Sequence, residues 1–430
     1  MKKYILIILC CLTSFPLWSY NVNMIVEHYS VDQGLPNNTV NCTLKDRDGF
    51  IWFGTWYGLC CFDGVKFKTF NKQEHDSDVP PRKIQRIVED KNGYIWVKTI
   101  DRKLYVFNKV TECFHAVYDD MKNYSENIQV IKLQNTAEGD VLLLTKDKNL
   151  LLAGVDEKGQ VTIKILFDSR DEINKHDYTL KHHVLCETEE YISWIGTDYK
   201  VSAVHKGAEL ASRPADFITS KINSGDKDSF TSFFEDGRKV WVGDRAGIFY
   251  SIDVRTGLVN RYVLSEIKGA ISNLLVTPAG YVYLSVAGQG TYEYDLAERR
   301  LQKINTEMND AMVTHAFIDQ YDKIWFHENE KALIYYDPLN HTAKRFPFTM
   351  FGKITTLYSE DAGERGLFFL SPAGEAWLFD REHAEMVYIN KLKQLSNDRA
   401  NQQFYHLMLD NDGVLWLSSA DEGVYCMNFP

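Results

Sequence analysis

One short pattern recurs along almost the whole chain and limits what the chain can fold into. Its clearest copies read DRDGFIWFGT at residues 46–55, DKNGYIWVKT at residues 90–99 and DNDGVLWLSS at residues 410–419. Each copy joins a turn of the Asp-x-Asp/Asn-Gly type to an apolar run centred on tryptophan. A tight turn that leads into a short apolar run is typical of a β-hairpin entering a buried strand. The chain is therefore expected to be all-β and repetitive.

Weaker copies fill the interval between these three, at spacings of 42 to 52 residues. The nine equivalent positions are Trp52, Trp96, Leu142, Trp194, Trp241, Tyr283, Trp325, Phe368 and Trp416. A period of about 45 residues, with aromatic residues at a fixed place, is typical of β-propeller blades of four strands each. The repeats predict a β-propeller in which these tryptophans form blade cores and do not stack on a ligand.

Nine repeats leave the number of blades open between seven and nine. Seven copies can form one ring and leave two for a second ring, or all nine can share one ring. The last copy ends after its third strand, whereas residues 25–31 have the pattern of an outer fourth strand. An N-terminal strand that completes the last blade would remove both open edges. The pattern therefore predicts a ring closed by the N-terminal strand.

The first residues have the pattern of a secretory signal. Met1-Lys-Lys precedes an apolar run from Tyr4 to Leu12, and the small residue Ser19 follows. So short an apolar run after a basic start favours a cleaved signal peptide, with an uncleaved anchor as the alternative. We assign residues 1–19 to the signal peptide and residues 24–430 to the repeat domain. The mature chain is expected in the periplasm or otherwise secreted, without a membrane span.

Composition narrows the classes of partner. Asp and Glu outnumber Lys and Arg by 59 to 48, which gives a net charge of −11. A nucleic-acid partner is not expected, because such proteins carry a strongly basic balance. Six cysteines follow the signal segment at irregular spacing, which favours small buried side chains and leaves one or two disulfides open. They are Cys42, Cys60, Cys61, Cys113, Cys186 and Cys426.

Motifs for catalysis and metal binding are missing from the sequence. The turns at Asp46–Gly49 and Asp410–Gly413 resemble calcium loops, but neither has a Glu six residues after its glycine. We interpret both as hairpin turns and expect no metal and no cofactor. Nucleophile, zinc and phosphate-loop motifs are also absent. The chain is predicted not to be an enzyme; a secreted propeller-type carbohydrate-active enzyme is the alternative.

The first repeat, Asp-x-x-Gly-x-Ile-Trp-x-Gly-Thr-x-x-Gly-Leu, resembles the two-component regulator propeller repeat. Residues 29–38, YSVDQGLPNN, resemble the opening of that family. The resemblance covers residues 24–430 and is specific in copies one, two, five and nine. It implies the periplasmic sensor region of a hybrid two-component system of gut Bacteroidetes, which recognises glycan fragments. Since kinase, receiver and DNA-binding motifs are missing, it implies a truncated sensor or a stand-alone binding protein.

The repeats diverge most between their second and third strands, in loops that a propeller gathers on one face. Aromatic rings stack on sugars, and charged or amide side chains hydrogen-bond hydroxyl or acidic groups, so these loops are candidates for an oligosaccharide or other small ligand. A second sensor propeller or another protein partner, bound by a scaffold, is the alternative. The candidate ligand-binding residues are Trp56, Tyr57, Asp101, Arg102, Asp198, Tyr199, Asp244, Arg245 and His327.

Overall fold

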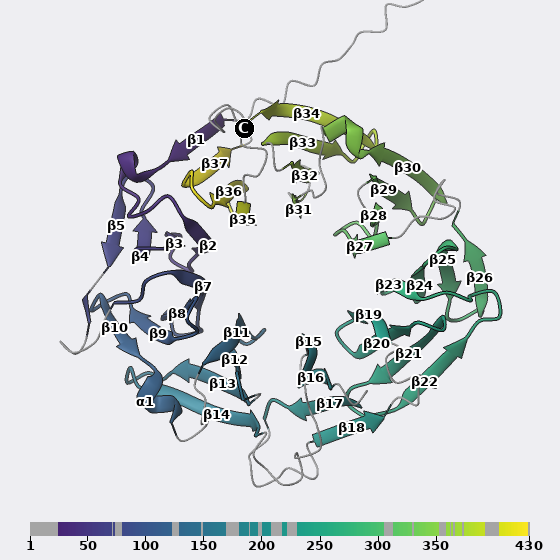
Figure 1. Ribbon diagram of the computed structural model, residues 1–430, viewed down its shortest axis with the longest axis horizontal. Helices are drawn as coiled ribbons and strands as arrows, with labels where there is room; N and C mark the ends of the chain where they lie inside the picture. The colour runs from purple at the N-terminus through teal and green to yellow at the C-terminus, as the bar shows by residue number, and fades with distance from the viewer. Residues whose placement is uncertain are drawn as a thin grey trace, which may run out of the picture.

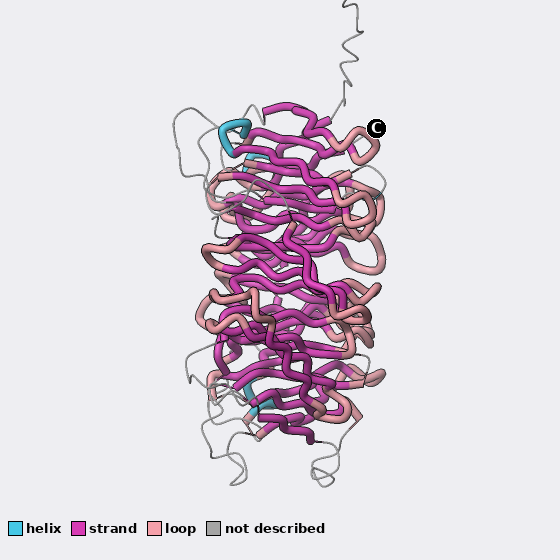
Figure 2. The backbone as a smooth tube through the Cα atoms, turned by 90° about the vertical axis from the view of Figure 1, so that its right-hand side faces the viewer, coloured by secondary structure: helices cyan, strands magenta, loops and turns pink. Residues whose placement is uncertain are grey.

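The described part of the chain is a ring of nine sheets of mainly antiparallel strands around a central opening (Figure 1). The computed structural model describes residues 25–428, except for residues 71, 74–79, 123–128, 148, 169–179, 189, 197–199, 208–216, 222–229, 305–312, 329–330, 352–357, 362, 364–365, 372–373 and 392–403. Seen from the side, the ring is a flat disc whose strands run across its thickness (Figure 2). The signal peptide assigned to residues 1–19 and Cys186's side chain lie outside the described residues.

Each sheet is one blade, and its strands follow one another from the central opening outward (Figure 1). The first strands are β2 (Val40–Lys45), β7 (Ile84–Glu89), β11 (Val130–Asn135), β15 (Leu180–Glu187), β19 (Phe230–Glu235), β23 (Ile271–Val276), β27 (Val313–Ile318), β31 (Tyr358–Asp361) and β35 (Phe404–Leu409). The second strands are β3 (Ile51–Thr55), β8 (Ile95–Thr99), β12 (Val141–Thr145), β16 (Tyr191–Gly196), β20 (Lys239–Asp244), β24 (Tyr281–Val286), β28 (Ile324–Glu328), β32 (Leu367–Leu370) and β36 (Val414–Ser419).

The outer half of each blade holds its third and fourth strands. The third strands are β4 (Gly58–Phe62), β9 (Leu104–Asn108), β13 (Leu150–Val155), β17 (Lys200–His205), β21 (Ile248–Asp253), β25 (Gly290–Asp295), β29 (Ala332–Asp337), β33 (Glu375–Asp380) and β37 (Val424–Asn428). The fourth strands of the first eight blades are β5 (Phe67–Phe70), β10 (Cys113–Ala116), β14 (Val161–Phe167), β18 (Phe217–Lys221), β22 (Val259–Val263), β26 (Arg300–Lys303), β30 (Thr342–Pro347) and β34 (Glu385–Lys391).

All nine positions that the sequence repeat singled out lie on second strands, so the ring has nine blades and not seven. In β3, β8 and β12 every residue is buried, because both faces of the strand pack against strands of neighbouring blades. The outer strand β30 is exposed at most of its positions. The described residues include three short helices, η1 (Val31–Gln33), α1 (Tyr118–Met121) and η4 (Phe348–Phe351). No described helix has the length and apolar character needed to cross a membrane.

The ninth blade combines strands from both ends of the described chain. The N-terminal strand β1 (Ile25–Tyr29) pairs antiparallel with β37, from Ile25 opposite Asn428 to Tyr29 opposite Val424. This is the pairing that the sequence predicts for the N-terminal segment. Pairing ends at Tyr29, because η1 begins at Val31 behind the capping residue Ser30.

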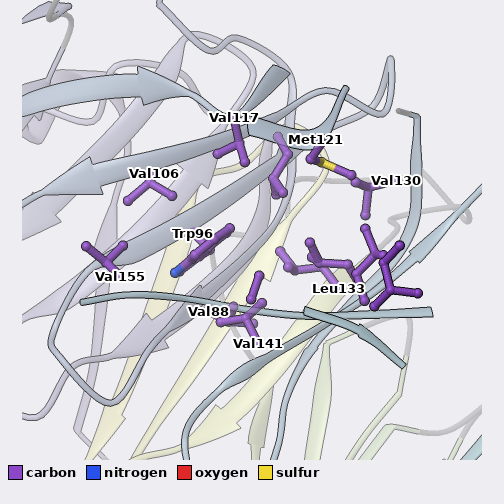
Figure 3. Packing of buried hydrophobic residues seen from close by; sticks show 14 residues of the cluster. Val88, Trp96, Val106, Val117, Met121, Val130, Leu133, Val141 and Val155 are labelled. Carbon is purple, nitrogen blue, oxygen red and sulfur yellow. The ribbon is translucent and has the colours of Figure 1, made fainter. Parts of the chain in front are cut away.

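Buried clusters join each blade to its two neighbours. Between blades two and three, Trp96 packs with Leu133, Val141 and Leu143, and burial of these apolar groups stabilises the blade boundary (Figure 3). Between blades nine and one, Phe53 packs with Trp416 in the same manner. The described part of the chain holds nine such clusters, one at every boundary in the ring.

The turn before each second strand explains the spacing of the repeat. Asp46 accepts hydrogen bonds through Oδ1 from the backbone N–H groups of Asp48 and Phe50, at 3.0 and 2.9 Å. Its Oδ2 accepts a hydrogen bond of 2.8 Å from Nε1 of Trp52, so one carboxylate fixes both the turn and the indole. The same Asp–Trp pair recurs at Asp90–Trp96, Asp236–Trp241, Asp319–Trp325 and Asp410–Trp416.

One connection between blades differs from the simple repeat. The segment β6 (Lys72–Gln73) follows blade one and pairs parallel with β10, so blade two has five strands. The chain is thereby held along the outer edge of blade two before it enters that blade at β7. Sequence alone did not predict this strand, because two polar residues carry no strand pattern.

Candidate functional site

The antiparallel order of the strands gives the disc two different faces. We call the loop face the one that carries the turns between second and third strands and the connections between blades. The turn face carries the turns between first and second strands and between third and fourth strands. The repeat motif Asp-x-Asp-Gly lies on the turn face, and the divergent turns lie on the loop face.

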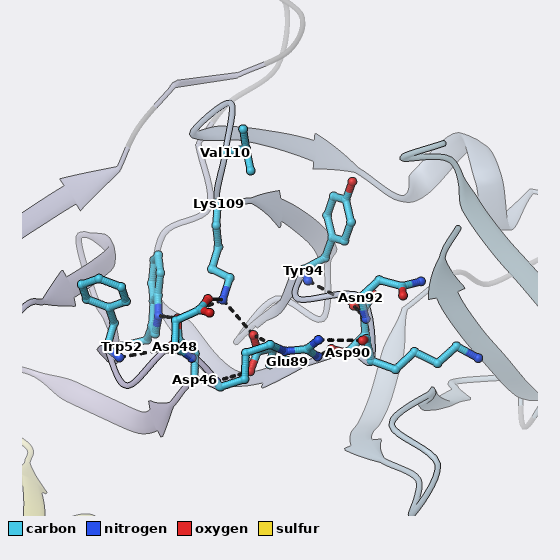
Figure 4. A network of polar contacts seen from close by, with 12 residues as sticks. Asp46, Asp48, Trp52, Glu89, Asp90, Asn92, Tyr94, Lys109 and Val110 are labelled. Atoms are coloured by element: carbon cyan, nitrogen blue, oxygen red, sulfur yellow. Dashed lines mark hydrogen bonds and ion pairs between the residues drawn. The ribbon is translucent and has the colours of Figure 1, made fainter. Parts of the chain in front are cut away.

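On the turn face, three acids of blades one and two converge on one lysine (Figure 4). Nζ of Lys109 lies 3.0 Å from Asp46, 2.7 Å from Asp48 and 2.8 Å from Glu89. These acids are the one group of described side chains with a spacing that suits a metal ion. Burial alone would lower the pKa of Lys109, but its bonds to Asp48, Glu89 and Asp46 raise that pKa above its ordinary value. The lysine ammonium therefore already occupies the centre of this acidic cluster.

The same arrangement joins two other pairs of blades. Lys206 bonds Glu138 of blade three at 2.8 Å and Glu187 of blade four at 2.6 Å. Arg381 bonds Asp319 of blade seven and Asp361 of blade eight, the latter at 2.8 Å. Each of these cations, like Lys109, directly follows a third strand, which places it over the turn of the preceding blade. The turn-face charges are thus used to hold blades together.

On the loop face, two adjoining pockets flank the turn between β8 and β9 in blade two. One has a volume of about 350 Å³ and extends outward to Tyr118 and Met121 of α1. The other has a volume of about 370 Å³ and extends toward blade one, to Pro80 and Lys83. Both are lined by Asp101, Lys103 and Tyr105, so the turn forms their common wall.

Positive charge dominates these pockets although the chain as a whole is acidic. The acid among the lining residues is Asp101, which is paired with Lys103 at 3.3 Å. The cations among them are Arg82, Lys83, Arg102 and Lys103. So many like charges around one acid give the pockets a positive potential.

A further cation lies beneath the turn. Lys98 of β8 is only 6% exposed, and its amine donates a hydrogen bond of 2.6 Å to Gln85. Burial, and secondly the nearby charge of Arg102, lower the pKa of Lys98 to about 8. The protein therefore holds a partly desolvated positive charge near Arg102, which lines the pocket toward α1.

Backbone hydrogen bonds connect the turn of blade one to the turn of blade two. The N–H of Lys83 donates to the carbonyl of Trp56, and the N–H of Ile100 donates to the carbonyl of Lys83, both at 2.9 Å. The Lys83 amine lies over the Trp56 ring, 5.4 Å from its centroid. Trp56, Tyr57 and Tyr118 are exposed aromatic side chains; Tyr118 lines the pocket toward α1, and Trp56 contacts Lys83 of the other pocket. The arrangement offers ring faces and charged hydrogen-bond donors to one ligand.

The structure brings together only part of the predicted site. Trp56, Tyr57, Asp101 and Arg102 lie on the neighbouring turns of blades one and two. Arg245 is exposed, but it follows β20, across the central opening from β3 and β8 (Figure 1). The predicted residues Asp198 and Tyr199 lie outside the described residues.

Two predicted residues have local partners. Asp244 is the last residue of β20 and is 2% exposed. Its carboxylate accepts hydrogen bonds of 2.8 Å from the N–H groups of Ala246 and Ile248, so it caps the turn. His327 lies within β28 and not in a loop, with its Nδ1 3.0 Å from Thr314 Oγ1 and its ring beside Phe348. Burial lowers the pKa of His327.

Several residues were not identified from the sequence: the pocket residues Arg82, Lys83, Lys103 and Tyr118, and the buried Lys98 beside them. The sequence does contain a pattern that could have identified these cations, because basic residues are concentrated in two segments of one repeat. The segments are PPRKIQR at residues 80–86 and KTIDRK at residues 98–103. These two segments lie side by side, because Arg86 is opposite Lys98 in the pairing of β7 and β8. Comparing single turns between repeats could not reveal a cluster that combines a strand, a turn and a blade entry.

Comparison with known proteins identifies the family that the first repeat matches. Residues 34–57 match the family described as "Two component regulator propeller". The match covers the first regulator-propeller repeat, from Gly34 through β3, and confirms the resemblance there. No curated protein sequence matches the chain.

Among solved structures, the extracellular domains of two putative hybrid two component systems from B. thetaiotaomicron are similar. The first shares 14% identity with this chain at a TM-score of 0.39, and the alignment covers 93% of this chain and 66% of that domain. The second shares 15% identity at a TM-score of 0.35, and the alignment covers 92% of this chain and 58% of that domain. The chain thus spans less than two thirds of either domain. The Dos1 propeller is similar at 12% identity and a TM-score of 0.48, over 94% of this chain and 93% of its own.

Proposed function

We propose that this chain is the ligand-recognition propeller of a secreted or periplasmic sensor and binds a glycan fragment beside the β8–β9 turn. The observation that carries the proposal is the pair of adjoining pockets, which combine the exposed ring of Tyr118 with charged hydrogen-bond donors, while the exposed Trp56 ring lies under the lining residue Lys83. Sugar recognition needs both, because rings stack on the apolar faces of a pyranose while polar groups bond its hydroxyls. The regulator-propeller match of residues 34–57 supports a sensory role.

The proposed role is recognition and not hydrolysis. Glycosidases commonly use two carboxyl groups on opposite sides of the scissile bond. Among the residues that line the two pockets, Asp101 is the acid, and it is already paired with Lys103. A bound glycan is therefore expected to leave unchanged. Transmission of the signal is assigned to a protein partner, such as a second sensor propeller.

Thermal unfolding against a panel of oligosaccharides tests this function. A ligand that binds only the folded state raises the melting temperature with its concentration. The expected result is a reproducible rise with one glycan class and no release of new reducing ends. Absence of any shift across neutral and acidic glycans would contradict the proposal, and release of reducing ends would favour an enzyme.

Blade one offers a matched pair of variants for the same assay. Trp56 and Phe50 lie beyond opposite ends of β3 and are 41% and 42% exposed, but Trp56 is on the loop face and Phe50 on the turn face. Trp56→Ala is expected to reduce the ligand-induced shift, whereas Phe50→Ala is expected to preserve it. Equal effects of the two substitutions would contradict a site on the loop face.

A further inference from the structure

We infer that the blade-two site selects glycans that carry a negative charge, namely carboxylated or sulfated saccharides. The inference rests on the proposed function and specifies its ligand class. It concerns a patch of the loop face made by the two pockets and the buried lysine beneath their shared turn.

The charges of the lining residues carry the inference. Arg82 and Lys83 line the pocket toward blade one, and Arg102 lines the pocket toward α1, while Lys103 lines both. Because Asp101 is paired with Lys103, it does not neutralise the other three. Guanidinium groups bind carboxylate and sulfate oxygens with two parallel hydrogen bonds, so Arg82 and Arg102 suit such a ligand.

The buried lysine adds a second, independent observation. Lys98 is 6% exposed and lies beside Arg102, and its amine donates a hydrogen bond to the neutral amide of Gln85. On the turn face, by contrast, the largely buried cations Lys109 and Arg381 contact two or three carboxylates each. An anionic group bound at Arg102 would offset the repulsion between the two cations, as carboxylates do on the turn face.

The backbone holds two of these cations in place. Lys83 and Arg102 have φ angles of 50° and 68°, in the left-handed region that side chains other than glycine rarely adopt. The N–H of Arg102 bonds Thr99, and its carbonyl accepts from Val130 of blade three, at 2.9 Å each. Hydrogen bonds thus hold the backbone of both residues before a ligand arrives, which lowers the backbone part of the entropy cost of binding.

The aromatic rings argue for a saccharide over a bare inorganic anion. Tyr118, which is 57% exposed, forms the outer side of one pocket together with the apolar Val117 and Met121. Each pocket has the volume of an ordinary small-ligand site, far more than sulfate or phosphate fills. A sugar ring that carries an acidic substituent uses both the ring faces and the cations.

Two pairs of probes test the inference on the full chain by titration calorimetry. The first is a tetragalacturonate and its fully methyl-esterified form; the second is a chondroitin sulfate tetrasaccharide and its desulfated, carboxyl-reduced form. The expected result is that at least one acidic member binds about tenfold or more tightly than its neutral form, with affinity that falls as salt rises.

Variants place the binding on blade two. Arg102→Gln together with Arg82→Gln is expected to lower the affinity for the acidic probe by about tenfold or more. Arg102→Lys keeps the charge but not the planar fork and is expected to lower it less. The matched control is Lys158→Gln, which removes an exposed charge on the turn between β13 and β14, on the turn face, and is expected to leave affinity unchanged.

The outcomes separate the inference from the proposed function. Equal binding of acidic and neutral members, or binding of neutral members alone, would overturn the charge selectivity and leave glycan recognition standing. Failure of all four probes, together with a panel of neutral plant and host glycans, would overturn both. Acidic binding that the double Arg variant leaves intact, in a protein with unchanged melting temperature, would overturn the location.

Discussion

The two faces of the disc are made by the ends of the same strands, yet they treat charge in opposite ways. On the turn face, Lys109 is surrounded by three carboxylates that come from two blades. On the loop face of blade two, four lining cations meet one acid, which is itself paired. At Lys109 the turn face satisfies its charges within the fold, whereas the loop face of blade two leaves charge available to a ligand.

This difference explains which positions are similar among the nine copies of the repeat and which positions differ. The Asp of the turn face bonds a turn, an indole and in places a cation, so a change there disturbs several interactions at once. The loop face connects strands that are already fixed by their blade cores, so its residues can vary without loss of fold. Variable loops on a rigid scaffold are where binding residues commonly lie.

The largest expected effect comes from the turn face. Lys109→Met would leave the buried carboxylate of Asp46 without its cation and Glu89 with Arg47 alone, and we expect the free energy of unfolding to fall by about 3–5 kcal/mol. Denaturant unfolding measures the change. Lys158→Met serves as the control, since its exposed side chain is expected to contribute almost nothing. A loss no larger than that of the control would remove the contrast between the faces.

A somewhat smaller loss is expected at the turn of blade two. Asp90 is 1% exposed and accepts hydrogen bonds from the N–H groups of Asn92 and Tyr94 and from Nε1 of Trp96. Asp90→Ala leaves these donors without acceptors and is expected to cost about 2–4 kcal/mol.

A double-mutant cycle with Trp96→Phe isolates the indole bond of Asp90. The two substitutions are expected to be less than additive by about 1 kcal/mol, since either one removes the same hydrogen bond. Strict additivity would mean that the Asp–Trp pair of the repeat does not act as a unit.

An opposite sign is expected on the loop face. Lys98→Met removes a buried positive charge and is expected to raise the free energy of unfolding at pH 7 by about 1–2 kcal/mol. The pKa of Lys98 falls from 10.5 to about 8 on folding, so between these values the unfolded chain binds more protons. Stability of the wild-type protein should therefore gain from Lys98 as pH rises through this window, and the variant should lack that gain.

Denaturant unfolding of both proteins at pH 7 and pH 9.5 checks this expectation. Lys98→Arg stays charged throughout this pH range. It is therefore expected to be less stable than Lys98→Met at both pH values. A destabilised Lys98→Met protein at pH 7 would show that Lys98 supports the fold, and would weaken the assignment of the loop face to binding.

The smallest effects are expected at the exposed loop-face turns. Tyr57→Ala changes a side chain that is 64% exposed, and we expect the free energy of unfolding to change by about 0.5 kcal/mol or less. The corresponding measurement is the melting temperature without ligand. A large loss would mean that this turn is part of the blade core and not a free binding element.

Sequence reasoning recovered the elements that local patterns specify. The apolar run around each repeat position predicted all nine second strands, and residues 25–31 were predicted to complete the last blade, of which Ile25–Tyr29 form β1. Blade number was left open, because each repeat contacts only its neighbours and no local signal states how many fit in a ring. The bond from Lys206 to Glu138 spans 68 residues, beyond the reach of any pattern read within one repeat.

The candidate site was recovered in part for the same reason. Trp56 and Arg102 stood out because their own turns diverge between repeats. Lys98 did not stand out, since it occupies an ordinary position in a buried strand, and its meaning appears only beside Arg102. Asp244 illustrates the converse: a polar residue at a turn was interpreted as exposed, whereas its carboxylate bonds the backbone of that turn.

The ninth blade also sets an order of events for folding. Its outer strand β1 is the first described segment of the chain, while its partner β37 is the last, so their pairing waits until synthesis has reached residue 428. Earlier blades form from neighbouring segments and need no such delay. Until β37 has been made, β1 has no strand edge with which to pair, and the first blade lacks one of its two neighbouring blades. The complete ring is therefore assembled in a final step, whose contacts are the least local in the molecule and close the longest loop.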